Sequence, residues 1–320
     1  MILAGLIILL VVAITVFFSK SEKPLFTPVG ENIPTKNLPE PSVVKKTTIL
    51  WGAYTGWLKS QVEDFEKKVG RQTNYLAAFV HWGNESEFPA ELADFAKKSN
   101  KTLIIFWEAM DYNITSPGDP RFSYSQILGG KFDQYIFDFA KAAKDYGGPI
   151  ILVPFEEMNG NWYPWSVTQN GNSAAEHIRS YRYLKNFFFG ISNVKFGWAV
   201  NSLSEPDVSG NKIEELYPGK DYVDFVGVNG FNFGEPWQSF EEIFGSVLQK
   251  LAEFNKPIII FSMACADGGK KAEWIEDALI GQIPKYPNLV GWSWFNEDKE
   301  KDWRVWSDAN SLKSFQKSLP

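Results

Sequence analysis

The stretch that decides the fold is Ile150–Trp165, which reads Ile-Ile-Leu-Val-Pro-Phe-Glu-Glu-Met-Asn-Gly-Asn-Trp-Tyr-Pro-Trp. Its first six residues form a near-continuous hydrophobic run, as expected of a parallel strand that is covered on both faces. Glu156 and Glu157 follow at once, and an amide, a glycine and aromatic rings come after them. We therefore predict a buried strand whose carboxyl end presents acidic, amide and aromatic side chains.

Seven further runs of this kind occur along the chain, and amphipathic segments separate them. The predicted strands are Thr48–Tyr54, Tyr75–His81, Thr102–Trp107, Ile150–Phe155, Val194–Ala199, Val223–Asn229, Pro257–Phe261 and Val290–Phe295. The predicted helices include Glu91–Lys98, Phe132–Lys144, Ala174–Phe188, Glu241–Phe254 and Ala272–Ile283, with Ile213–Tyr217 as the weakest. Eight strand–helix repeats predict an α/β fold, a (β/α)₈ TIM barrel, as a single domain over residues 47–320. An open, doubly wound sheet is the alternative, and the missing G-x-G-x-x-G motif after the first strand counts against it.

The segment before the barrel predicts a membrane anchor and a linker. Residues 1–18 carry no charge, and as a helix they would span about 27 Å, close to the hydrocarbon thickness of about 30 Å. No basic n-region and no Ala-x-Ala cleavage pattern accompany them, which favours an uncleaved signal anchor over a cleaved signal peptide. Lys20 and Lys23 follow this span and by themselves favour the orientation opposite to export. Residues 19–46 contain five prolines and predict an extended linker.

The composition excludes several classes of protein. The net charge is −6 without a basic block in the body of the chain, so nucleic acid is a poor candidate partner. Cys265 is the one cysteine and His81 and His177 are the two histidines, so an intramolecular disulfide is impossible and no zinc site is obvious. We expect no metal and no organic cofactor. The 13 Trp residues raise the prospect of a sugar cleft, because indole rings present flat apolar faces with a polar edge.

In a β/α barrel the active site lies at the carboxyl ends of the strands. These positions hold carboxylates, amides and indoles, which suits a neutral, polyhydroxylated ligand better than a phosphate or a metal. They are Tyr54, Trp57, His81, Trp82, Trp107, Glu108, Glu156, Glu157, Asn159, Asn201, Asn229, Asn232, Ser262, Trp294, Asn296 and Glu297. A carboxyl group beside rings and an amide is what general acid catalysis at a glycosidic oxygen requires, because desolvation keeps it protonated.

The stretch that ends in Trp165 resembles the motif H-E-M-N-G-x-W-Y-P-W of glycoside hydrolase family 26. The likeness continues in Ser192–Asn201, Tyr217–Asn232 and Trp294–Arg304. This resemblance implies that Glu157 is the acid/base of a hydrolase that acts on a β-linked polysaccharide. The implied substrate-binding residues are Glu156, Asn159, Trp162, Trp165, Trp107, Asn201, Phe231 and Trp294.

The chain departs from the family pattern at four positions. Retaining members use a second glutamate on strand seven as the nucleophile, roughly 5 Å from the first carboxyl. The matching segment here is Lys256–Ala264, in which Ser262 stands at the nucleophile position. Val153 and Glu156 replace the usual Arg and His, and Phe231 replaces a Tyr. These changes are compatible with drift or repurposing, and a Glu-to-Ser change is also what an engineer makes to trap a substrate.

Three hypotheses follow. In the first, the chain is a glycanase in which Glu157 is the acid and Glu156, Asp267 or Glu297 activates water in an inverting geometry, which needs a carboxyl separation of roughly 6.5–9.5 Å. In the second, it is a catalytically silent carbohydrate-binding protein. In the third, it is a surface scaffold with a vestigial cleft. The family implies mannan, β-glucan or β-1,3-xylan as the glycan, and we expect a monomer outside the cytoplasm, either secreted or held to the membrane by residues 1–18.

Overall fold

The computed structural model describes residues 49–83, 87–114 and 117–320, and the described residues form one compact unit. The predicted anchor at residues 1–18 and the predicted linker at residues 19–46 lie outside these ranges. Within the described ranges, no helix is both long and apolar enough to cross a membrane.

Eight parallel strands pair in chain order, and the pairing of β8 with β1 closes them into a barrel. The strands are β1 (Leu50–Tyr54), β2 (Tyr75–His81), β3 (Thr102–Glu108), β4 (Ile150–Pro154), β5 (Val194–Asn201), β6 (Phe225–Asn232), β7 (Ile258–Cys265) and β8 (Leu289–Phe295). The predicted (β/α)₈ barrel is confirmed, and the open-sheet alternative is wrong because no edge strand remains between β1 and β8.

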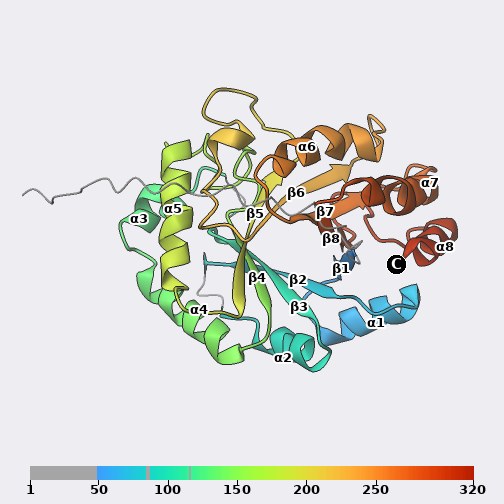
Figure 1. Cartoon of the computed structure of the whole chain (residues 1–320), viewed down its shortest axis with the longest axis horizontal. Helices are drawn as coiled ribbons and strands as arrows, with labels where there is room; N and C mark the ends of the chain where they lie inside the picture. Colours follow the sequence, from blue (N-terminus) through green and yellow to red (C-terminus); the bar gives the residue numbers. More distant parts are fainter. Residues whose placement is uncertain (1–48, 84–86, 115–116) are drawn as a thin grey trace, which may run out of the picture. The chain divides into compact units, whose positions relative to one another are not determined.

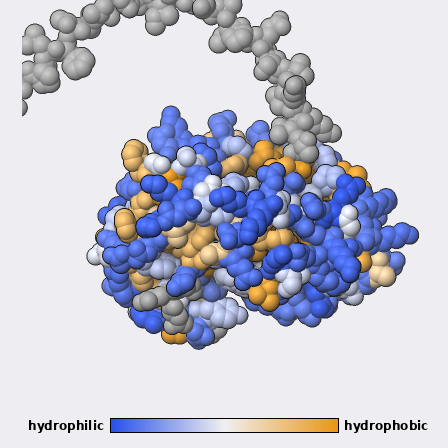
Figure 2. Space-filling model, turned by 90° about the horizontal axis from the view of Figure 1, so that it is seen from below, coloured by the Kyte–Doolittle hydropathy of each residue, from blue (hydrophilic) through white to orange (hydrophobic). Residues whose placement is uncertain are grey.

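Helices surround the strands on the outside of the barrel (Figure 1). The α-helices are α1 (Lys59–Val69), α2 (Ala90–Lys98), α3 (Tyr124–Leu128), α4 (Asp133–Tyr146), α5 (Ala174–Phe187), α6 (Ser246–Ala252), α7 (Lys271–Glu276) and α8 (Ala309–Ser318). The short helices are η2 (Pro120–Phe122), η3 (Ile213–Glu215), η4 (Glu241–Gly245), η5 (Asp277–Gln282) and η6 (Ile283–Lys285). The connection after β5 holds only the single turn η3, as its weak sequence signal predicted. On the face shown in Figure 2, hydrophobic residues are interspersed among hydrophilic ones.

Local signals fix the elements on either side of β4. Gly147 ends α4 with a φ of +68°, a backbone conformation that glycine adopts at little cost, so the chain turns directly into β4. Ser173 begins α5, and its hydroxyl accepts a hydrogen bond from the backbone N–H of Glu176. The segment between these two signals therefore contains one strand and the loop that carries Glu157.

Aromatic side chains fill the barrel interior. Phe79 stacks on Phe106 with the ring centroids 4.5 Å apart, and Phe261 meets Phe106 edge to face at 6.4 Å. Gly227 makes room for this packing, because a Cβ atom there would lie only 2.1 Å from the carbonyl oxygen of Ile259. Since the interior is apolar, the functional polar groups are confined to the ends of the strands.

Two buried polar clusters lie outside the barrel mouth. The ammonium of Lys101, which is 2% exposed, donates to Glu66 Oε1 at 2.7 Å and to the carbonyl of Thr73 at 2.8 Å. His177 of α5 is fully buried, and its Nδ1 lies 2.7 Å from the hydroxyl of Tyr124. Burial lowers the pKa of His177 to about 3, so this imidazole is neutral in the folded protein.

Candidate active site at the barrel mouth

Glu157 lies on a tight turn directly after β4. Phe155 and Glu157 have φ values of +56° and +53°, a left-handed conformation that is uncommon for residues other than glycine. The backbone N–H of Glu157 donates to the carbonyl of Ala199 in β5 at 2.9 Å, which ties the turn to the neighbouring strand. Such strained residues persist where the surrounding structure over-determines them, and they cluster at functional sites.

Two hydrogen bonds hold the Glu157 carboxyl group. Trp162 Nε1 donates to Oε2 at 2.8 Å, and Asn229 Nδ2 donates to Oε1 at 2.9 Å. Burial raises the pKa of Glu157, whereas these two donors oppose the rise because they stabilise the ionised form. The carboxyl group is thus raised in pKa and held in one orientation, as a general acid requires.

The Glu156 side chain is buried. It is 1% exposed, and burial followed by the charge of Glu108 raises the pKa of its carboxyl group. Glu108, at the end of β3, is paired with His81, whose Nδ1 lies 2.5 Å from Glu108 Oε2. The Glu156 side chain is thus enclosed, and its predicted substrate contact and its predicted role in activating water stay predictions.

Asn159 and Trp165 position the loop after β4. Asn159 is fully buried; its Nδ2 donates to the carbonyls of Asn201 and Leu203, and its Oδ1 accepts from the backbone N–H of Asn201 at 2.7 Å. Trp165 is also fully buried, and its Nε1 donates to the carbonyl of Glu156 at 2.8 Å. Both fix the backbone around Glu157, and their predicted contacts with a substrate stay predictions. Asn201 itself is half-buried at the end of β5, so its predicted substrate contact stays a prediction.

Trp107 and Trp294 lie between the strands and the helices. Trp107 has no exposed surface, stacks on Phe139 of α4 at 4.6 Å, and donates from Nε1 to the hydroxyl of Tyr135. Trp294 is equally buried, and its Nε1 donates to the carbonyl of Trp303. Successive strand residues point to opposite faces, and these two point outward to the helices. Their predicted substrate contacts stay predictions.

Ser262 takes its place through an irregularity in β7. Val228 pairs with Ile260 while the next residue, Asn229, pairs with Ser262, so Phe261 is an extra residue on β7. Ser262 is thereby brought beside Asn229, the residue that holds Glu157. This register supports the predicted proximity of position 262 to the acid.

Phe231, at the end of β6, is half-buried in an aromatic group. Its ring lies 5.3 Å from Trp303 and 5.8 Å from Phe295. Its predicted contact with a substrate stays a prediction, and it would be made through an apolar ring.

Two of the carboxylates considered as water-activating bases lie elsewhere at the mouth. Glu297 lies two residues after β8, the strand opposite β4 in a barrel of eight, and it is half-buried. Burial raises the pKa of Glu297, and the charges of Arg304 and Lys299 oppose this rise. Asp267 follows β7 and is exposed.

The sequence model of glycosyl hydrolase family 26 matches residues 43–316 of this chain. The chain belongs to this family. It is 33% identical over 283 residues to endoglucanase H of Acetivibrio thermocellus, and the match covers 84% of this chain and 30% of that protein. It is 25% identical over 161 residues to a mannan endo-1,4-beta-mannosidase of Bacillus subtilis, covering 49% of this chain and 42% of that enzyme. The chain thus spans less than half the length of either relative.

Solved structures agree with the fold. The family 26 β-mannanase of Bacteroides ovatus superimposes with a TM-score of 0.67 at 17% identity, covering 85% of this chain and 88% of that one. The endo-β-1,4-mannanase catalytic domain of Bacillus sp. JAMB-750 gives a TM-score of 0.65 at 16% identity, covering 84% of this chain and 85% of that one. At such low identity this likeness shows the fold alone.

The mouth of this family 26 barrel also carries exposed apolar side chains that the sequence analysis did not single out. Tyr112, Leu203 and Phe233 are 66%, 63% and 47% exposed in the loops after β3, β5 and β6. Trp57 and Trp162, which the sequence did indicate, are 43% and 38% exposed after β1 and β4. Apolar residues placed directly after predicted strands would have been the signal for the three that were missed.

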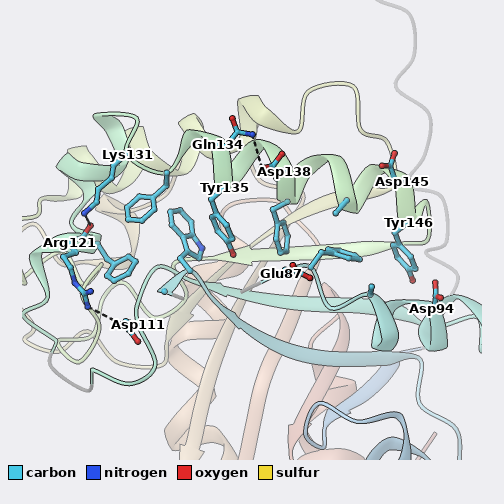
Figure 3. Close-up of a pocket in the computed structure, with 18 residues that line it drawn as sticks. Glu87, Asp94, Asp111, Arg121, Lys131, Gln134, Tyr135, Asp138, Asp145 and Tyr146 are labelled. Carbon is cyan, nitrogen blue, oxygen red and sulfur yellow. Dashed lines mark hydrogen bonds and ion pairs between the residues drawn. The ribbon is translucent and has the colours of Figure 1, made fainter. Parts of the chain in front are cut away.

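A separate groove of about 1120 Å³ runs along α4 on the flank of the barrel (Figure 3). Tyr135 and Asp138 of α4 line one side, and Trp82 and Asp111, from the segments after β2 and β3, also line it. Neither Glu157 nor Ser262 belongs to its walls. The groove is therefore distinct from the site around the acid.

Proposed function

We propose that this family 26 chain binds a β-linked polysaccharide at the barrel mouth without cleaving it through a covalent glycosyl-enzyme. One observation carries the proposal: β7 presents Ser262 beside Asn229, which holds the acid Glu157. A retaining glycosidase needs a carboxylate there to attack the anomeric carbon. A serine hydroxyl is a poor nucleophile without an adjacent base, and it supplies no negative charge to an oxocarbenium-like transition state.

The ligand that we propose is a β-glucan. The match to the endoglucanase is higher in identity and covers more of this chain than the match to the mannosidase. The exposed rings of Trp57, Tyr112, Trp162 and Phe233 stand around the mouth, and such rings stack on the apolar faces of sugar units. Binding therefore needs no intact catalytic pair.

A second candidate function is hydrolysis by an inverting route. It is favoured by Glu157, whose pKa is raised by burial as a general acid requires, and by Glu297 on the opposite side of the barrel. In that case Glu297 would deprotonate the attacking water while Glu157 protonates the leaving oxygen.

The two functions are separated by measuring binding and bond cleavage on the same samples of the full chain. We expect retention of mixed-linkage β-glucan with no release of reducing sugar. Release that is abolished by both Glu157→Gln and Glu297→Gln would favour the inverting route, whereas Asp267→Asn serves as the carboxylate control. Absence of binding to β-glucan and to mannan would overturn both functions.

The substitution Ser262→Glu tests whether the missing carboxylate at position 262 is the reason that the chain does not cleave its ligand. If the rest of the site is competent, the restored carboxylate gives reducing-sugar release from a glycan that the wild type binds, and Ser262→Gln, of similar size, does not. A bound glycan that remains uncleaved by Ser262→Glu would show that loss of the nucleophile is not the main defect.

We also propose that the chain acts as a monomer outside the cytoplasm and that residues 1–18 anchor it in a membrane. The uncharged run in this segment supports the anchor, and the polymeric ligand proposed above supports the location. Fractionation of cells expressing the full chain tests this, since recovery in the cytosol would contradict it.

A further inference from the structure

Three carboxyl groups meet in a region that is nearly closed to solvent. Glu108, Glu156 and Glu157 are 4%, 1% and 9% exposed, and they lie at the ends of the adjacent strands β3 and β4. The imidazole of His81, at the end of β2, pairs with Glu108 at 2.5 Å. The potential cations near the three acids are therefore His81, which pairs with Glu108, and Lys299, which faces Glu157.

The Glu156 carboxyl group lacks a donor among the described residues, since neither of its oxygens accepts a hydrogen bond from an N–H or a hydroxyl. Burial raises the pKa of the Glu156 carboxyl group, and the nearby Glu108 carboxyl group at the end of the adjacent strand raises it further. Two carboxyl groups in one buried site cannot both ionise, so the arrangement with a proton between them is the stable one.

We propose that Glu108 and Glu156 share one proton behind Glu157, and that loss of this proton as the pH rises weakens the hold of the barrel mouth on a β-glycan. The second part rests on the proposed function, whereas the first part does not. The family motif has a histidine at position 156, which carries its own N–H donor. A glutamate can donate there only while it is protonated.

The surroundings offer little to stabilise a second negative charge. The titratable groups that face the pair are His81 from β2, Tyr54 from β1, and Glu157 and Tyr163 from the segment after β4, while Lys299 faces Glu157. His81 is already paired with Glu108. A charge on Glu156 would therefore meet the acidic side chains of its neighbours.

This charge would act on the loop that carries the exposed Trp162. The carbonyl of Glu156 accepts the hydrogen bond from Trp165, and Trp162 bonds the adjacent Glu157. His81 also stacks under the exposed ring of Tyr112, with the centroids 4.9 Å apart. Both exposed rings are thus one or two contacts from the shared proton.

Infrared difference spectroscopy of the full chain tests the shared proton directly. We expect the C=O stretching band of a buried carboxylic acid at neutral pH in the wild type, its loss in Glu156→Gln, and its retention in Glu157→Gln. Glu108→Gln supplies an amide donor to Glu156, so the band should titrate at lower pH in that variant. A band that Glu156→Gln leaves unchanged, or that titrates identically in Glu108→Gln, would overturn the proposal.

The second measurement is β-glucan affinity from about pH 5 to about pH 9. We expect the affinity of the wild type for β-glucan to fall about tenfold or more over this range, which is the effect of one pKa unit of unfavourable charge. The affinity of Glu156→Gln, whose side chain is always neutral, should change far less. Equal pH dependence in both proteins would refute the coupling to glycan binding. No binding by either protein, with the carboxylic band present, would refute the proposed function and leave the shared proton standing.

Discussion

The most direct test of the site removes the buried donor to the acid by the substitution Asn229→Leu. Asn229 is 3% exposed and donates to Glu157 Oε1 at 2.9 Å, so water cannot readily replace it. A hydrogen bond to a charged group is worth about 1.5–3 kcal/mol, which corresponds to about ten- to a hundredfold in the ionisation constant of Glu157. We therefore expect the substitution to raise the pKa of Glu157, because the donor favours the ionised form.

The assay is a titration of the Glu157 carboxyl carbon by nuclear magnetic resonance, assigned by its absence in Glu157→Gln. Trp162→Phe should act in the same direction but more weakly, because Trp162 is 38% exposed and water can take its place. Asn201→Leu is the matched control, since the Asn201 amide donates to the carbonyl of Leu203 in the loop after β5 and not to Glu157. An unchanged or lowered pKa in Asn229→Leu would refute the account of the acid.

Three further predictions concern stability. The pKa of His177 in the folded protein is about 3, below its value in the unfolded chain. Its contribution to the free energy of unfolding is therefore fully present above the unfolded pKa and is lost as the pH falls. Relative to His177→Gln, the wild type should lose about 2 kcal/mol of unfolding free energy between pH 7 and pH 5, measured by urea titration. Lys101→Met leaves the carboxylate of Glu66 without its buried cation and should cost about 3 kcal/mol, measured in the same way, whereas a change below about 1 kcal/mol would contradict the pairing. Gly227→Ala should cost about 3 kcal/mol through steric overlap with the β7 backbone, and a wild-type melting temperature would contradict that packing.

Trp162 combines a hydrogen bond to Glu157 with an exposed ring face. Its indole N–H holds the Glu157 carboxyl group, while a substantial part of its ring remains open to solvent. A sugar unit stacked on this ring would exclude water from the acid and strengthen its hydrogen bonds, since such bonds are stronger in a low-dielectric environment. Glycan binding and the ionisation of Glu157 should therefore be coupled.

The sequence by itself determined the order of the elements and the position of Glu157 after the fourth strand. Hydrophobic runs separated by amphipathic segments specify parallel strands with helices outside, and they place Glu157 directly after β4. This information is local, because the periodicity of a strand or a helix is written in consecutive residues. The substitution at position 262 is likewise visible in the sequence alone.

Tertiary structure decided which side of the barrel wall each side chain occupies. Trp107 and Trp294 end predicted strands just as mouth residues do, yet both point to the helices. The extra residue at Phe261 shifts the register that puts Ser262 beside Asn229, and the pairing of β3 with β4 brings the strand ends near Glu108 and Glu156 together although these residues are far apart in the chain. The direction in which a side chain faces and the distant residues beside which it lies depend on strand register and on burial by distant segments, and no local pattern encodes either.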